Sequence, residues 1–209
     1  EYLEEIIRKN LVCLNSFKNS NKKIPLFNGA TEREIHSFLE YLEKLNYRTE
    51  KKLSIVGKIQ ILENKKTKLF FASGDPPEYK LSRDYQSGPL SFEYFFEGEK
   101  IITNCGFGQN ISTKAELISK LTAGQSTLTI NDTSVVKFER NKLINKIFGN
   151  SIKNTFKTDD LNIKNDKDLI GCSVSHNGYE KNFGCLHKRE IYLDYKNNKL
   201  KGADHIFKK

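Results

Sequence analysis

The feature that most constrains the fold of this chain is a series of short apolar–polar alternations that begins near Lys51 and continues almost to the last residue. Ile55, Ile59 and Ile61 follow a period of two, which is typical of strands with one buried face. The further runs predicted as strands are Lys68–Ala72, Leu90–Phe96, Lys100–Asn104, Ser126–Ile130, Val135–Phe138, Ile170–His176, Leu186–Tyr195 and Lys199–Ala203. Many short strands with frequent turn signals predict a mainly β fold, either an antiparallel sandwich or a barrel.

Turn-forming residues join several of these runs into hairpins. Glu97-Gly98, Asn131-Asp132 and Asn197-Asn198 each lie between two predicted strands. Asn197-Asn198 predicts a two-residue turn, because asparagine tolerates a positive φ. The stretch Asn141–Asp168 is polar and rich in Asn and Lys, so it is predicted to be a surface excursion rather than part of the sheets.

The first 50 residues have a different period. Apolar residues recur at helical spacing in two segments, which comprise Leu3, Ile6, Ile7, Leu11 and Leu14, and then Ile35, Phe38, Leu39, Leu42 and Leu45. Thr31 and Glu34 have the spacing of a capping box at the start of the second helix, and Pro25 and Asn28-Gly29 mark the loop between the helices. Two amphipathic helices cannot bury their apolar stripes alone, so they require packing partners.

Composition bounds the class of protein. The chain has 209 residues, of which 37% are hydrophobic and 29% charged, so it is globular. No apolar run approaches the roughly 18 residues that a membrane span requires, and no signal peptide is visible. The chain contains no Met and begins at Glu1, and we therefore expect it to be an internal or processed piece of a longer protein.

The charge of +9 at pH 7 favours polyanionic partners, which include nucleic acid, an anionic membrane surface and an acidic polysaccharide. The lysines are scattered, and no zinc-finger or RNP motif is present, so the charge is equally consistent with a solvated lysine-rich surface. Cys13, Cys105, Cys172 and Cys185 are widely spaced and form no C-x-x-C motif. Cys172 and Cys185 could face each other across a hairpin, but buried free thiols are the favoured interpretation.

Three ordered blocks resemble the heparinase II/III-like family of bacterial polysaccharide lyases. They are GPLSFEYFFEGEKIITNCG (88–106), LTAGQSTLTINDTS (121–134) and SHNGYEKNFGCLHKREIYL (175–193), and IPLFNGA (24–30) is similar to the segment that precedes the β domain of that family. The resemblance implies an α/α toroid followed by antiparallel β-sandwich layers. Residues 1–50 would then be the last toroid helices, and residues 51–209 an antiparallel β-sandwich domain.

The resemblance also implies a chemistry. Such enzymes cleave the bond next to a uronic acid by β-elimination: the carboxylate is neutralised, a His or Tyr removes the C5 proton, and a Tyr protonates the leaving oxygen. Most of those groups belong to the toroid. Many relatives carry His where this chain has Gln86 and Gln125. Glutamine donates and accepts hydrogen bonds but does not titrate, so these two residues are predicted to bind substrate rather than to act as bases.

The last block supplies the remaining candidates. The resemblance implies catalytic roles for His176 and Tyr179, and a carboxylate-binding role for Arg189. His187, which shares a strand face with Arg189, is the candidate ligand for a divalent metal, zinc or calcium. The alternative is structural: His176 could shape a turn, and Arg189 could form a cross-strand salt bridge. Gln125 is expected at the cleft, close to at least one of His176, Tyr179 and His187.

Taken together, these features favour part of a polysaccharide lyase whose partner is an acidic polysaccharide. A non-catalytic glycan-binding relative on the same scaffold is the alternative, and a nucleic-acid-binding β domain is a weaker third hypothesis. We expect neither nucleic acid nor membrane as a partner, and the resemblance implies the bacterial periplasm as the location.

Overall fold

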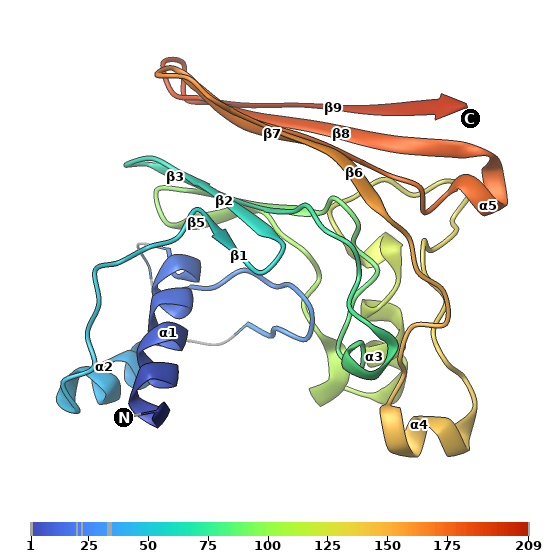
Figure 1. The fold of residues 1–209 in the computed structure, drawn as a ribbon, viewed down its shortest axis with the longest axis horizontal. Coiled ribbons are helices and arrows are strands. Elements are labelled where there is room, and N and C mark those ends of the chain that lie inside the picture. Colours follow the sequence, from blue (N-terminus) through green and yellow to red (C-terminus); the bar gives the residue numbers. More distant parts are fainter. Residues whose placement is uncertain (1, 20, 22, 33–34, 209) are drawn as a thin grey trace.

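The computed structural model describes residues 2–19, 21, 23–32 and 35–208, and places two helices before two stacked antiparallel sheets (Figure 1). The helices are α1 (Tyr2–Phe17) and α2 (His36–Lys44), and both lie on the side of the first sheet that faces away from the second. This arrangement confirms the prediction of a mainly β, sandwich-like fold preceded by two helices.

The first sheet has five strands in the order β1-β2-β3-β4-β5, and every neighbouring pair is antiparallel. Its strands are β1 (Ile55–Val56), β2 (Ile59–Glu63), β3 (Thr67–Ala72), β4 (Phe92–Phe96) and β5 (Glu99–Ile102). Glu97 and Gly98 join β4 to β5 with φ values of 49° and 88°, a left-handed conformation that glycine adopts without strain. The predicted hairpin at this position is confirmed.

The second sheet has the order β6-β7-β8-β9 and is also antiparallel. Its strands are β6 (Thr158–Asn165), β7 (Leu169–His176), β8 (Cys185–Asp194) and β9 (Lys199–Lys208), with the short helix α5 (Glu180–Phe183) between β7 and β8. The predicted β8–β9 hairpin is confirmed, although Asp194 pairs with Lys199. The loop therefore has four residues instead of two, and of Asn197 and Asn198 only Asn198 has a positive φ.

The remaining short elements lie in the long connection between β3 and β4 and in the segment between the two sheets. They are η1 (Tyr79–Leu81), η2 (Gly108–Asn110), α3 (Thr113–Ser119), η3 (Thr122–Gly124) and α4 (Lys142–Phe148). Helix α3 begins with a side-chain cap, because the Ser112 hydroxyl accepts a hydrogen bond from the Ala115 amide.

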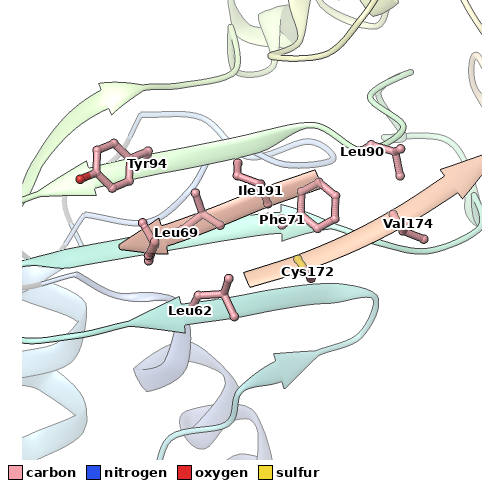
Figure 2. Close-up of a cluster of buried hydrophobic side chains, with 9 residues drawn as sticks. Leu62, Leu69, Phe71, Leu90, Tyr94, Cys172, Val174 and Ile191 are labelled. Carbon is pink, nitrogen blue, oxygen red and sulfur yellow. The ribbon is translucent and has the colours of Figure 1, made fainter. Parts of the chain in front are cut away.

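The main core lies between the two sheets (Figure 2). Its buried side chains are Leu62, Leu69, Phe71, Leu90 and Tyr94 from the first sheet and its flank, and Cys172, Val174, Ile191 and Leu193 from the second sheet. A smaller cluster of Ile61, Phe70 and Phe95 occupies the opposite face of the first sheet. Because β3 is buried on both faces, its apolar run is continuous rather than alternating.

Two predicted strands are wrong. Ser126–Ile130 and Val135–Phe138 form only isolated bridges, in which Ile130 pairs with Thr133 and Phe138 with Ile152. Side chains take the place of a strand partner here: the Phe92 amide donates to the Ser126 hydroxyl at 2.8 Å, and the Ser126 amide donates to Asn104 Oδ1 at 2.9 Å. Such side-chain hydrogen bonds compete with ladder formation. The predicted excursion 141–168 is also partly wrong, since it contains β6.

The capping box involves Glu34, which lies outside the described residues. The described helix α2 begins at His36 after Ile35, which makes no capping hydrogen bond through its side chain. Of its predicted apolar stripe, Leu39 is buried, whereas Phe38 and Leu45 are about half exposed. The described residues thus cover the stripe of α2 only in part.

All four cysteines are free thiols, and Cys172 lies opposite Ile191 in the sheet rather than opposite Cys185. The interpretation as unpaired thiols is therefore confirmed. None of the helices in the described part of the chain is long and apolar enough to cross a lipid bilayer.

Candidate functional site

An open cleft of about 620 Å³ lies beside the first sheet, between α1, the segment before α2 and the turn after β3. It has an apolar wall, to which Phe27 and Tyr85 contribute, and a polar side, to which Asp75 and Asp84 contribute. Both glutamines singled out from the sequence, Gln86 and Gln125, line the same cleft. The structure therefore brings these two residues together.

Both glutamine amides point their nitrogens at one backbone carbonyl. Gln86 Nε2 and Gln125 Nε2 each donate to the Ser119 carbonyl at 2.8 Å. Gln86 Nε2 also donates to the Gly106 carbonyl at 2.8 Å, and Gln86 Oε1 accepts from the Gly29 amide at 3.3 Å. The Gln86 side chain is thus fully used in joining three segments of the chain.

A buried carboxyl, Glu93, lies behind this region. Its Oε1 accepts from the Leu26 amide at 2.9 Å, the Asn104 amide at 3.0 Å and the Thr103 hydroxyl at 3.1 Å. Burial raises the pKa of Glu93, and these hydrogen bonds oppose that rise. Glu93 therefore fixes the segment around Leu26, which forms one edge of the cleft, onto strand β4.

A second group of polar residues lies in the second sheet. Its members, His176, His187 and Asp204, are joined in a row by hydrogen bonds. The Gly178 amide donates to His176 Nδ1 at 3.0 Å, so the proton of the neutral His176 ring resides on Nε2. That Nε2 lies 3.0 Å from His187 Nδ1, and His187 Nε2 lies 2.7 Å from Asp204 Oδ1. The order of donation is therefore His176 to His187 to Asp204.

Arg189 links these hydrogen-bonded residues to the segments that flank the first sheet. It donates to both oxygens of Asp204, from Nε at 2.7 Å and from Nη2 at 2.9 Å. Its Nη1 donates to the carbonyls of Leu90 at 2.8 Å and Ser126 at 2.6 Å. Arg189 thus forms a cross-strand salt bridge with Asp204, as the structural alternative described, and each of its three guanidinium nitrogens donates a hydrogen bond.

These polar groups are almost completely enclosed. His176 and His187 are 1% and 0% exposed. Burial, together with the charge of Arg189 and the neighbouring His187, lowers the pKa of His176 to about 3. Burial alone would raise the pKa of Asp204, but the hydrogen bonds from His187 and Arg189 hold it well below its usual value. At neutral pH His176 is uncharged and Asp204 is ionised.

Tyr179 is equally enclosed, with 0% exposure. Its hydroxyl donates to the Leu128 carbonyl at 2.8 Å, and burial raises its pKa to about 12. The catalytic roles of His176 and Tyr179 stay predictions, and the contacts of both side chains with the interior favour a structural role in this chain.

The residues do not fit the metal that the resemblance implies. Both ring nitrogens of His187 are engaged, and Gln86 and Gln125 direct N–H groups, which cannot ligate a cation, at Ser119. Within the described ranges, no three His, Cys, Asp or Glu side chains lie close enough together to hold a metal ion.

The expected proximity of Gln125 to the histidines stays a prediction. The described contacts link them only indirectly: Ser126, the residue after Gln125, accepts from Arg189, which in turn holds Asp204. Sequence reasoning missed Asp204, Glu93 and Ser119. The predicted two-residue turn would have placed Ile206 opposite Arg189, and only the observed four-residue loop places Asp204 there. Ser119 acts through its backbone carbonyl and gave no signal in the sequence.

Two stacked antiparallel sheets preceded by helices define a β-sandwich domain with a cleft at its helical side. The chain belongs to the heparinase II/III-like, C-terminal family, whose model matches residues 49–209. No curated protein matches the sequence.

Solved structures share the fold at low sequence identity. A heparan sulfate lyase, HepC from Pedobacter heparinus, matches with a TM-score of 0.62 and 14% identity over 93% of this chain and 31% of its own. The Heparinase III-BT4657 gene product matches with a TM-score of 0.66 and 14% identity over 98% of this chain and 32% of its own. A further heparinase III structure matches at 0.52 and 13% identity, over 92% and 32%. This chain therefore spans about a third of the length of these proteins.

Proposed function

We propose that this chain is the β domain of a polysaccharide lyase that acts on uronic-acid-containing chains by β-elimination. The observation that carries the proposal is the family match over residues 49–209. The cleft lined by Gln86 and Gln125 is the part of the domain that would contact the polysaccharide. In this reaction a base removes the C5 proton, the bond between C4 and the glycosidic oxygen breaks, a C4–C5 double bond forms and the leaving oxygen takes up a proton.

In this proposal, groups outside residues 1–209 transfer the protons, because the two buried side chains predicted for that role already donate their protons to other groups of the domain. His176 donates to His187, and the Tyr179 hydroxyl donates to Leu128. Gln86 and Gln125 do not titrate. In this proposal the domain shapes and closes the substrate site, and the bacterial periplasm, which the resemblance suggests, is the proposed location.

Non-catalytic binding of an acidic glycan is the alternative, and the neutral amides in the cleft favour it. The two functions are separated by incubating this chain and the natural full-length protein with a panel of uronate-containing polysaccharides. Ultraviolet absorbance then detects the unsaturated uronate. We expect product from the full-length protein and none from residues 1–209 alone. If the full-length protein binds these polysaccharides but forms product from none of them, the alternative is supported.

A further inference from the structure

Two loops that line the cleft are packed directly against each other. One is the turn from Gly88 to Ser91, and the other contains Gln125. A Cβ at Gly88 would lie 2.8 Å from Ser91 Oγ and 3.2 Å from Gln125 Cγ, which is closer than ordinary contact. Gln125 therefore occupies space that only a glycine in the turn leaves open, and its position depends on the position of the turn.

The turn contains a strained residue. The Ser91 amide donates to the Gly88 carbonyl at 3.1 Å, which closes a four-residue turn with Pro89 and Leu90 at its centre. Leu90 has a φ of 55°, a left-handed conformation that a type II turn requires at its third position and for which Gly or Asn is ordinarily used. A leucine in this conformation is destabilising, and it persists only where the surrounding structure holds it.

Arg189, on β8 of the second sheet, holds both loops by their backbone carbonyls. Its Nη1 donates to the Leu90 carbonyl at 2.8 Å, within the turn, and to the Ser126 carbonyl at 2.6 Å, directly after Gln125. Its guanidinium carbon lies 5.3 Å from the centroid of the Phe92 ring. One nitrogen of a side chain from the second sheet thus joins two loops of the cleft.

The guanidinium is itself fixed in orientation. Asp204 accepts from Nε at 2.7 Å and from Nη2 at 2.9 Å, and this bidentate pair determines where Nη1 points. Asp204 also accepts from His187 at 2.7 Å. Arg189 is only 8% exposed and is not among the described residues that line the cleft. A molecule in the cleft would therefore meet the two loops and not Arg189.

We infer that Arg189 is a positioning residue for the cleft: by holding the carbonyls of Leu90 and Ser126, it fixes the turn and Gln125 where they would contact the polysaccharide. The inference rests on the proposed function, because it concerns the same cleft. This role differs from the direct carboxylate binding that the resemblance implies. Lysine cannot fill it, since an ammonium is a point charge without the planar fork that reaches Asp204 and two carbonyls together.

The test compares the natural full-length protein with its Arg189→Lys variant on the uronate-containing polysaccharide that it cleaves best. Because the proposed function places proton transfer outside residues 1–209, misplaced loops should raise KM about five- to tenfold and change kcat by less than about twofold. A purely structural role gives the opposite result, since partial unfolding removes active protein and lowers the apparent kcat at unchanged KM. Arg140→Lys makes the same substitution at an exposed position outside the cleft and should leave both constants unchanged.

Hydrogen exchange measured by mass spectrometry on the same proteins gives a readout that does not depend on activity. The amides of residues 88–92 and 125–127 should exchange at least about fivefold faster in Arg189→Lys, whereas those of β2 should keep the wild-type rate.

If the full-length protein forms unsaturated product, then a lower kcat at unchanged KM, or unchanged exchange in both loops, overturns the inference and leaves the proposed function standing. If no substrate is cleaved, the proposed function fails, and the exchange rates of the two loops alone decide the inference.

Discussion

His176 Nε2 and His187 Nδ1 lie 3.0 Å apart on neighbouring strands, and the direction of their hydrogen bond is fixed from both ends. The Gly178 amide can only donate, which makes His176 Nδ1 an acceptor, and the ionised Asp204 can only accept from His187 Nε2. Only one arrangement of protons satisfies all three hydrogen bonds among Gly178, His176, His187 and Asp204. A second proton on the His176 ring would take the place of the hydrogen bond that Nδ1 accepts from Gly178.

Acid should therefore destabilise the protein through His176. Its pKa is about 3 in the folded protein and about 6.5 when unfolded, so the unfolded state binds more protons between these values. The stabilisation is complete above pH 6.5 and falls by about 1.4 kcal/mol per pH unit as the pH drops toward 3. Urea unfolding at pH 7, 6, 5 and 4 measures the slope. His176→Gln should flatten it, whereas His36→Gln, at an exposed histidine, should not.

Asp204→Ala should destabilise the second sheet. It removes the acceptor for His187 and both acceptors for Arg189, which is only 8% exposed. Because the Asp204 side chain is itself 37% exposed, solvent screens part of the loss, and we expect about 1–3 kcal/mol. Chemical denaturation measures it. Asp168→Ala, in the exposed turn between β6 and β7, is the matched control and should change stability by less than about 0.5 kcal/mol.

Gly178→Ala should disturb the histidine pair by direct collision. A Cβ at this position would lie 2.3 Å from Val135 Cγ1 and 2.9 Å from His176 Nδ1. We expect a loss of about 1–3 kcal/mol of unfolding free energy. Gly184→Ala is the comparison: its Cβ would meet nothing within 4 Å, and only its left-handed φ of 63° opposes the change, at about 1 kcal/mol. Equal losses for the two variants would contradict the collision.

Metal should have no effect on stability. The glutamine amides direct donors at the Ser119 carbonyl, and His187 has no free nitrogen. Zinc, calcium or a chelator should therefore shift the thermal midpoint by less than about 1 °C, since a ligand stabilises only through binding to the folded state. A chelator-dependent fall in the midpoint would show that a metal is held after all.

The β8–β9 hairpin shows what local sequence can specify. The alternation of His187, Arg189 and Ile191 assigned these side chains to one face, and the structure buries all three on that face. The period of two is a property of the extended backbone, so it is visible without tertiary structure. The same rule failed for Ser126–Ile130, because there the Ser126 and Asn104 side chains satisfy backbone groups that a strand partner would otherwise satisfy.

The sequence by itself determined which faces are buried, where most hairpins turn and to which family the chain is similar, because each depends on residues close together in the chain. Tertiary structure alone decided which polar groups meet. Gln86 and Gln125 converge on the carbonyl of Ser119, 33 and 6 residues away, and Arg189 reaches the carbonyl of Leu90, 99 residues away. Such contacts are set by how the sheets and loops pack, and a backbone carbonyl leaves no trace in the sequence. For that reason the convergence of the two glutamines at the cleft became visible only in the folded chain.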